Sequence, residues 1–315
     1  MPPQAIVRIG TRASRLAQAQ SRLMQARIAA ALGAPPEEAE AVAPLVLITT
    51  SGDRIQDRRL LEAGGKGLFV KEIEEALLEG RIDCAVHSMK DMPAELPDGL
   101  VIAAVPERED PRDAFVSLQW AALDELPQEA RLGTASLRRQ AQALHRRPDL
   151  RVEMLRGNVD TRLRKLEAGE FDAVLLAAAG LNRLGLSDHA RGFLEPADAP
   201  PAPGQGALAI ETVAQAAGAA WLAPLHHAPT AIAVAAERGA MYALEGSCRT
   251  AIGAYARVEG ERLTLTVEAL IPDGSARFRR EASIGAGASV EAATRLGLDL
   301  GAQVRAEGGD RLLLR

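Results

Sequence analysis

The stretch Ile-Gly-Thr-Arg-Ala-Ser at residues 9–14 returns in shortened form as Leu-Gly-Thr-Ala-Ser at residues 132–136. In each copy we expect a strand to end, a Gly-Thr turn to follow, and a serine to begin a helix. Such a serine caps the helix, and the free N–H groups of the first turn favour an anion. One copy alone is explained equally well by an ordinary helix cap that binds no anion. Two copies predict two similar α/β domains, each presenting an anion-binding helix start to a shared cleft.

The sequence around both copies alternates between short apolar runs and helical patterns. The runs predict strands at residues 5–9, 45–50, 82–87, 100–105, 114–118, 152–155 and 173–177. Apolar or small residues at a helical period predict helices at 14–32, 68–78 and 159–168. Strands that alternate with helices indicate doubly wound domains with largely parallel sheets.

A stretch rich in proline and glycine, residues 196–206, interrupts this alternation and predicts a crossing between domains. A strand at 207–211 could return to the first sheet. Beyond it, a helix at 231–244, strands at 252–258, 263–269 and 276–284, and a helix at 289–305 indicate a small antiparallel α+β domain. The predicted fold is therefore two α/β domains, like the lobes of periplasmic binding proteins, and a third domain. We place the boundaries at 1–106 with 207–225, at 107–206, and at 226–315.

The composition limits the classes of function. The 315 residues are 47% hydrophobic and 25% charged, with a net charge of −5, which argues against a nucleic-acid partner. The beginning of the sequence lacks the pattern of a signal peptide, and no apolar run reaches the ~18 residues of a membrane span. Two cysteines make neither a disulfide framework nor a thiolate-rich metal site. We expect a cytoplasmic protein without a metal, and a monomer, since no association segment is evident.

Basic residues gather where predicted strands pass into helices. Any one of them could be an ordinary solvated side chain, but ligands of open α/β sheets bind at the carboxyl ends of the strands. The planar fork of arginine suits carboxylates in particular. So many basic residues in an acidic chain predict a ligand with several carboxylates. These candidates are Arg12, Lys66, Lys90, Arg138, Arg139, Arg156, Arg162 and Arg183.

The sequence His-Ser-Met-Lys-Asp-Met-Pro at residues 87–93 directly follows a predicted strand. An aspartate at such a strand end, Asp91, can bind an N–H group or a cation and move a proton. A surface salt bridge with Lys90 explains the pair equally well. His87 is better read as a structural residue at the strand end, and Cys84 as part of the core.

Cys248 lies in Leu-Glu-Gly-Ser-Cys-Arg-Thr, residues 244–250, a short loop after a predicted helix. A thiol there would be accessible, and the glycine lets the backbone bend around an attached group. A small hydrophobic residue in a turn is the commoner explanation for an arbitrary cysteine. The carboxylate-binding loops elsewhere favour an attachment point for an anionic group.

Together these motifs resemble the porphobilinogen deaminase family, also called the hydroxymethylbilane synthases, of tetrapyrrole (haem) biosynthesis. The resemblance runs from about Val7 to the end of the sequence. Its order and spacing are too specific for chance, and His-Ser-Met-Lys-Asp is the most specific part. The matching segments are residues 11–14, 64–69, 87–93, 133–139, 155–158, 203–206 and 244–248.

The resemblance implies an enzyme that joins four porphobilinogen molecules head to tail, with loss of ammonia, into linear hydroxymethylbilane. It implies a dipyrromethane cofactor held by a thioether to Cys248, and Asp91 as the catalytic aspartate that holds pyrrole N–H groups and stabilises a cationic intermediate. It also implies the residues that bind the cofactor, the substrate or the growing chain. These are Arg12, Ser14, Lys66, Ser88, Lys90, Thr134, Ser136, Arg138, Arg139, Arg156, Arg162 and Arg183.

Three positions depart from the family pattern. Ser247 replaces a usual glycine, Glu62 stands where a basic residue is expected, and Ala135 replaces a common serine. The alternative function is a two-lobed binding protein for a small polycarboxylate. It explains the repeat and the arginines, but it leaves Cys248 and the pair Lys90-Asp91 without a role.

Overall fold

The computed structural model describes residues 6–54, 69–244, 250–285 and 287–312. The chain divides into two compact units, Met1–Arg108 with Ala207–Ala231, and Glu109–Gly206 with Ile232–Arg315. Each unit contains one five-stranded sheet, and the second unit also contains a three-stranded sheet. The sheets confirm the predicted fold class, whereas the three-domain boundaries stay a prediction.

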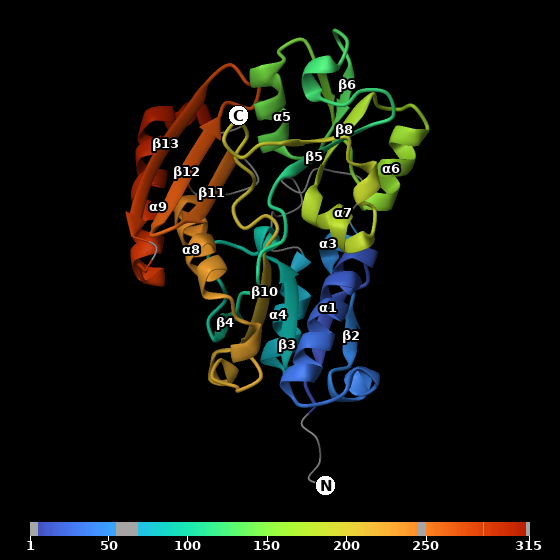
Figure 1. Cartoon of the computed structure of the whole chain (residues 1–315), viewed down its shortest axis with the longest axis vertical. Coiled ribbons are helices and arrows are strands. Elements are labelled where there is room, and N and C mark those ends of the chain that lie inside the picture. Colours follow the sequence, from blue (N-terminus) through green and yellow to red (C-terminus); the bar gives the residue numbers. More distant parts are fainter. Residues whose placement is uncertain (1–5, 55–68, 245–249, 286, 313–315) are drawn as a thin grey trace. The chain divides into compact units, whose positions relative to one another are not determined.

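The first sheet has the strand order β2-β1-β3-β10-β4, and Figure 1 labels its strands β2, β3, β10 and β4. Strand β1 is parallel to β2 and β3, and β10 is antiparallel to both β3 and β4. The predicted return of the chain to this sheet is therefore confirmed. The strands are β1 (Ile9–Arg12), β2 (Leu45–Ile48), β3 (Cys84–Ser88), β4 (Leu100–Ala104) and β10 (Leu208–Val213).

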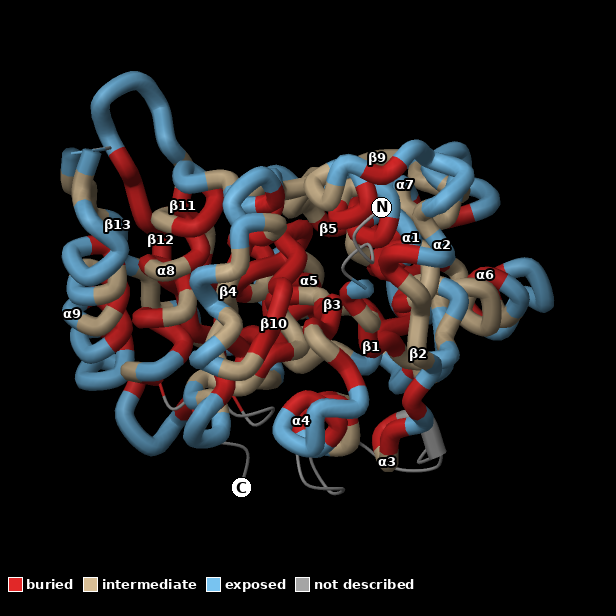
Figure 2. The backbone as a smooth tube through the Cα atoms, turned by 90° about the horizontal axis from the view of Figure 1, so that it is seen from below, coloured by how far each residue is buried: buried red, intermediate tan, exposed pale blue. Residues whose placement is uncertain are grey.

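The helices of the first unit cover both faces of this sheet. Met24 of α1 packs in one core cluster with Val86 and Ile210. Ile73 of α4 packs in another with Ala85. Strands β3 and β10 are consequently buried along almost their whole length (Figure 2). The helices are α1 (Arg15–Ala31), α2 (Ala39–Val42), α3 (Ser51–Arg54) and α4 (Lys71–Leu78).

The second sheet repeats the first, with the strand order β7-β6-β8-β5-β9. Strand β6 is parallel to β7 and β8, and β5 is antiparallel to β8 and β9. The strands are β5 (Asp113–Ser117), β6 (Arg131–Gly133), β7 (Arg151–Glu153), β8 (Ala173–Ala177) and β9 (Gly192–Leu194). The helices are α5 (Leu137–Arg146), α6 (Val159–Glu167) and α7 (Ala178–Leu184).

The two sheets also agree in register, residue by residue. Gly10 pairs with Ala85 in the first sheet, and Gly133 pairs with Val174 in the second. Thus β1 corresponds to β6 and β3 to β8, which confirms the internal repeat. Helix α7 and strand β9 are not predicted by the sequence, because α7 lacks a capping side chain and β9 has three residues.

Gly10 and Thr11 lie within β1, and Gly133 is the last residue of β6, so neither copy forms the predicted Gly-Thr turn. The first strand also begins at Ile9, where the sequence predicts its end. A Cβ atom on Gly10 would lie 2.3 Å from Ile82 Cδ1, and one on Gly133 would lie 2.9 Å from Phe171 Cδ1. Both glycines therefore allow close packing against a residue shortly before the next parallel strand, and the rigid Phe171 ring makes the restriction stronger at Gly133.

The carboxyl-terminal sheet is antiparallel, in the order β11-β12-β13, as the sequence predicts. Its strands are β11 (Ala251–Glu259), β12 (Arg262–Leu270) and β13 (Arg277–Gly285), and its helices are α8 (Ala228–Ala243) and α9 (Val290–Gly308). The helices approach closely, since a Cβ atom on Gly297 would lie 2.0 Å from the Ala236 carbonyl oxygen. None of the helices within the described ranges is long and apolar enough to cross a membrane.

Within the second unit, the antiparallel sheet packs against α5. Ala141 of α5 forms a small core cluster with Ala251 and Leu270. The Nε2 of Gln142 donates to Glu268 Oε1 at 2.9 Å. Both apolar and polar contacts therefore connect the second α/β sheet with the carboxyl-terminal sheet.

Candidate active site

The junction between β1 and α1 presents Arg12 and Ser14. The Ser14 hydroxyl accepts a hydrogen bond from the Ala17 N–H at 3.3 Å and caps α1, as the sequence predicts. The guanidinium carbon of the half-buried Arg12 lies 4.2 Å from the centre of the Phe69 ring, a cation–π contact that restrains the side chain. Lys66 and Glu62 lie outside the described residues.

Strand β3 ends in a single 3₁₀ turn, Met89–Asp91, that holds Lys90 and Asp91. Met89 and Met92 are buried at 1% and 0% exposure and anchor the turn on both sides. The Met89 N–H also donates to the Ala207 carbonyl oxygen at 3.0 Å. The half-buried Asp91 carboxylate is thus held on a rigid element at the carboxyl end of a central strand.

Two further residues of β3 have defined partners. The Ser88 hydroxyl accepts a hydrogen bond from Gln20 Nε2 at 2.9 Å. His87 is buried, and its Nε2 lies 3.0 Å from Glu211 Oε2. Cys84 is a core residue, as the sequence predicts, and burial raises the pKa of its thiol.

The second helix start, at α5, contains Thr134 and Ser136. The Ser136 hydroxyl caps the helix by accepting from the Arg139 N–H at 3.4 Å. The buried Thr134 hydroxyl accepts from the Ser136 N–H at 3.1 Å. Both predicted serine caps are therefore confirmed.

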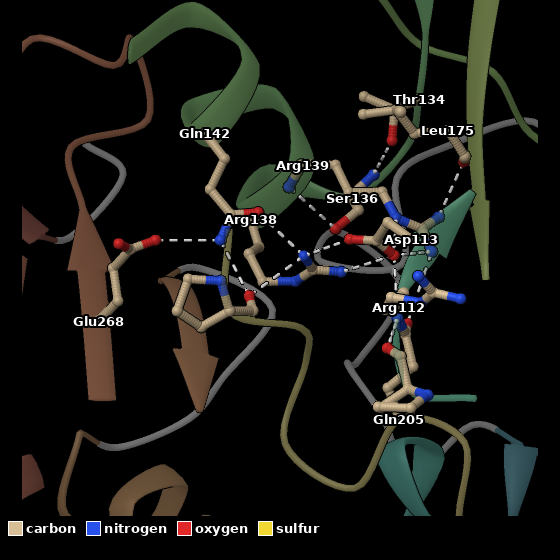
Figure 3. A network of polar contacts seen from close by, with 12 residues as sticks. Arg112, Asp113, Thr134, Ser136, Arg138, Arg139, Gln142, Leu175, Gln205 and Glu268 are labelled. Carbon is tan, nitrogen blue, oxygen red and sulfur yellow. Dashed lines mark hydrogen bonds and ion pairs between the residues drawn. The ribbon is translucent and has the colours of Figure 1, made fainter. Parts of the chain in front are cut away.

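A buried carboxylate, Asp113 at the start of β5, organises the two arginines of α5 (Figure 3). Arg138 Nη1 lies 2.6 Å from Asp113 Oδ2, and Arg139 Nη2 lies 2.7 Å from Asp113 Oδ1. Gln205 Nε2 donates to the same carboxylate at 2.9 Å. Burial alone would raise the pKa of Asp113, but the charges and hydrogen bonds of the arginines hold it well below its ordinary value.

The network continues from Arg138 toward the carboxyl-terminal sheet (Figure 3). Arg138 Nη1 donates to Gln142 Oε1 at 2.9 Å, and Gln142 Nε2 donates to Glu268 Oε1 at the same distance. Glu268 is fully buried and also accepts from Arg279 Nε at 2.8 Å. Both arginines are buried, but Arg138 connects to the carboxyl-terminal sheet, whereas the charge of Arg139 acts on Arg162.

Arg139, Arg156 and Arg162 form a cationic cluster around the starts of α5 and α6. Burial and, secondarily, the positive charges of Arg139 and Arg156 lower the pKa of Arg162 to about 10. Arg162 Nε donates to the Gly157 carbonyl oxygen at 2.9 Å. The Nη1 of Arg156 is buried without a hydrogen-bond partner within the described part of the chain. Such a cluster favours an anionic ligand that would supply the missing acceptor.

Arg183, after β8, is held by Nη2 donating to the Gly206 carbonyl oxygen at 2.6 Å. Burial lowers the pKa of its guanidinium, against the opposing charge of Glu109. Cys248 lies outside the described residues. Among the residues that are described, no group of three or more His, Cys, Asp and Glu side chains could hold a metal ion.

The sequence does not predict a role for Asp113 or Gln205, the two residues whose side chains accept hydrogen bonds from Arg139. A signal for Asp113 exists, because an aspartate that opens an otherwise apolar strand must find a buried cationic partner. Within the first unit the structure brings together Ser88, at the end of β3, and Lys90 and Asp91 in the turn that follows. Whether the two helix starts face one cleft stays a prediction.

Two family models match the chain. Residues 7–220 match "Porphobilinogen deaminase, dipyromethane cofactor binding domain", and residues 231–306 match "Porphobilinogen deaminase, C-terminal domain". Two solved structures are similar at 14–15% identity and a TM-score of 0.43. One is a nutrient binding protein from Burkholderia cenocepacia, which aligns over 70% of this chain and 90% of its own. The other is a periplasmic substrate-binding protein of an ABC transporter from Coxiella burnetii, which aligns over 74% of this chain and 97% of its own.

Relatives match the whole length of the chain. The porphobilinogen deaminase of Caulobacter vibrioides is 66% identical over 321 residues, which cover 100% of this chain and 99% of the relative. That of Phenylobacterium zucineum is 63% identical over 320 residues, with complete coverage of both. The chain therefore belongs to the porphobilinogen deaminase family and has the activity of that family, hydroxymethylbilane synthesis in tetrapyrrole biosynthesis.

Proposed function

We propose that this chain joins four porphobilinogen molecules head to tail on a dipyrromethane primer bound through a thioether to Cys248, with Asp91 as the catalytic carboxylate. Each addition forms one carbon–carbon bond, breaks the carbon–nitrogen bond of the aminomethyl group, and releases ammonia with the proton lost by the pyrrole carbon. Water releases the finished hydroxymethylbilane. The observation that carries this proposal is the Asp91 carboxylate on its anchored turn at the end of β3.

The arginine cluster of the second unit fits a dipyrromethane. The unpartnered Arg156 Nη1 and the lowered pKa of Arg162 both favour carboxylate groups beside them. When bound, the dipyrromethane supplies the pyrrole carbon to which the first substrate is joined. We propose that twelve residues bind the carboxylates and pyrroles of cofactor, substrate and growing chain. They are Arg12, Ser14, Lys66, Ser88, Lys90, Thr134, Ser136, Arg138, Arg139, Arg156, Arg162 and Arg183.

Asp91 is suited to its proposed task by charge and by rigidity. Its carboxylate accepts hydrogen bonds from pyrrole N–H groups and stabilises the positive charge that develops as the amine leaves. It also assists proton transfer to the departing amine. A turn that is anchored by Met89 and Met92 needs little reorganisation when the charge develops.

The protein is further proposed to be a cytoplasmic monomer with three domains, at the boundaries given by its sequence. A two-lobed binding protein for a polycarboxylate is no longer needed as an alternative, because the family assignment accounts for the same arginines. Porphobilinogen is accordingly the small-molecule partner, and neither a nucleic acid nor a membrane is required.

Intact-mass spectrometry combined with a turnover assay tests the proposal. We expect wild-type protein to carry the added mass of two linked pyrrole units, and Cys248→Ala to lack it. Asp91→Ala should keep this mass and the fold but lose turnover by about 100-fold or more. Asp98→Ala, an exposed aspartate in the same loop, is the control. An unmodified wild-type chain would exclude the thioether, and normal turnover of Asp91→Ala would remove Asp91 from its role.

A further inference from the structure

Three buried ionisable side chains lie on β3, the strand that leads into the Asp91 turn, and on its neighbours α4 and β10, and they have no part in the proposed chemistry. Glu74 comes from α4, His87 from β3 and Glu211 from β10, and their exposures are 8%, 5% and 0%. His87 and Glu211 lie on the same face of the sheet, since Glu211 pairs with Ala85, two residues before His87. Their side chains meet, with His87 Nε2 3.0 Å from Glu211 Oε2.

These groups are costly to bury. Glu74 Oε1 and Glu211 Oε1 are both buried without a hydrogen-bond partner in the part of the chain that the structure describes. Burial and, secondarily, the charge of Glu211 raise the pKa of Glu74 to about 7, with the charge of His87 acting in the opposite direction. Near neutral pH, Glu74 therefore carries a proton much of the time, which relieves the repulsion between the two carboxyl groups.

The second sheet provides an internal comparison for this acid–imidazole cluster, Glu74, His87 and Glu211. Because Ser88 corresponds to Ala177, the counterpart of His87 is Leu176, and that of Glu211 is Val116. Helices α4 and α6 end before the positive-φ glycines Gly80 and Gly169, so the counterpart of Glu74 is Leu163.

All three counterparts are buried in one apolar core cluster of the second unit. A sheet with this topology and register therefore forms without the three polar groups. The chain that follows the two strands also differs: β3 leads into Lys90 and Asp91, whereas β8 leads into α7 with Gly180 in place of Asp91. The polar cluster thus accompanies the catalytic turn rather than the fold.

We infer that Glu211, supported by Glu74, is a positioning residue for the Asp91 turn and acts through His87. The Glu211 carboxylate accepts the hydrogen bond of His87 Nε2 and so fixes the imidazole ring. The His87 backbone continues directly into Ser88 and the turn, which also pairs with the start of β10 through Leu208 and Ala207. Strand β10 thus holds the turn in two ways, through its own backbone and through the side chain of Glu211. The inference rests on the proposed role of Asp91.

Two kinds of variant separate positioning from stability. Glu211→Gln retains an oxygen that can accept from His87 Nε2, whereas Glu211→Val supplies the residue of the second sheet. We expect kcat of the holoenzyme to fall about 10- to 100-fold in Glu211→Val, since small displacements of a catalytic group cost that much. KM for porphobilinogen should change by less than about 3-fold, because only Ser88 and Lys90 of the twelve proposed binding residues lie beside Asp91 and would move with it. Glu211→Gln should recover most of the kcat.

A triple variant keeps the test decisive if Glu211→Val fails to fold. Glu74→Leu, His87→Leu and Glu211→Val together reproduce the core of the second sheet, so the protein should fold and still lose kcat. Glu75→Gln, at an exposed neighbour on α4, is the matched control. Normal kcat in the folded triple variant, or equal loss in Glu211→Gln and Glu211→Val, would overturn the inference.

A double variant distinguishes this inference from the proposed function. If Asp91→Ala abolishes turnover while the Glu211 variants turn over normally, only the positioning role fails. If Asp91→Ala turns over normally, the proposed catalytic role fails first. In the Asp91→Ala background, Glu211→Val should lower the residual turnover by less than about 3-fold, because the group that it positions is absent.

Discussion

The two five-stranded sheets have the same order and register, yet each buries charge where the other is apolar. In the second sheet, Asp113 binds Arg138 and Arg139 at the start of α5. The corresponding positions of the first sheet are Leu208 on β10 and Leu16 and Ala17 after the Ser14 cap. In the first unit, Glu74, His87 and Glu211 form a buried cluster around β3, where the second unit has Leu163, Leu176 and Val116.

The difference shows which features build the fold and which serve the site. Capping serines, close-packed glycines and apolar strands occur in both sheets, so they are sufficient for this topology. Each buried charged cluster occurs in one sheet only. Because buried ion pairs often contribute little net stability compared with apolar side chains, their retention points to function. One cluster holds the two arginines at the start of α5, where we propose that anions bind, and the other adjoins the strand that leads into the turn for which we propose a catalytic role.

The largest effect is expected from removing Asp113 alone. Asp113→Ala leaves the guanidinium groups of Arg138 and Arg139 buried without their carboxylate, which should cost about 3–5 kcal/mol of unfolding free energy. Asp113→Leu with Arg138→Leu and Arg139→Ala copies the first sheet and should recover most of that loss. Urea denaturation of the three proteins measures the difference. A triple variant as unstable as Asp113→Ala would break the equivalence of the two sheets.

The pH dependence of stability should differ between the sheets because of Glu74. Folding raises the pKa of Glu74 to about 7 from its ordinary 4.5, so the folded state binds an extra proton between these values. Its contribution to stability is therefore complete below pH 4.5 and is lost as the pH rises through 7.

Glu74→Gln resembles the protonated carboxyl group and should be more stable than wild type at pH 8 by about 2–3 kcal/mol. The gain should vanish at pH 4.5. Thermal or urea unfolding across this range measures it, with Glu75→Gln as the exposed control. A gain that is equal at both pH values would show that Glu74 is not the titrating group.

The smallest effect is expected at the glycines that both sheets share. In Gly133→Ala the new methyl group would meet the rigid Phe171 ring as well as Leu155 Cδ2, whereas in Gly10→Ala it would meet only the movable end of Ile82. We expect a loss of about 1–2 kcal/mol for Gly133→Ala and less for Gly10→Ala. Denaturation midpoints show which variant loses more stability. A larger loss for Gly10→Ala would mean that the strands adjust differently in the two units.

Local patterns were sufficient to predict much of this molecule. The serine caps, the alternation of apolar runs and the proline-rich crossing predict the repeat and the return of β10 to the first sheet. The glycines were assigned to turns because a sequence does not show which neighbour approaches a backbone. Helix α7 was missed because its alanines carry no amphipathic period.

The candidate site likewise contains residues that the sequence predicts and residues that it does not. The arginines at strand ends and the Asp91 turn can be predicted, because they come directly after apolar runs that predict strands. Asp113 and Glu211 act through partners that are distant in sequence, Arg138 by 25 residues and His87 by 124. Such pairs depend on the tertiary arrangement, and each residue alone looks like an isolated acid in a strand. The burial of Arg138 within this network likewise could not be read from its place beside Arg139.

The position of β10 has a consequence for the order of folding. All strands of the second sheet lie between Asp113 and Leu194, so this sheet can form from one continuous segment as the chain is synthesised. The first sheet cannot be completed without β10, the strand between β3 and β4. This strand is synthesised only after all the strands of the second sheet. Its long-range pairing makes this a slow step. The same strand delivers Glu211, so the support beneath the Asp91 turn is among the last parts of the α/β structure to assemble.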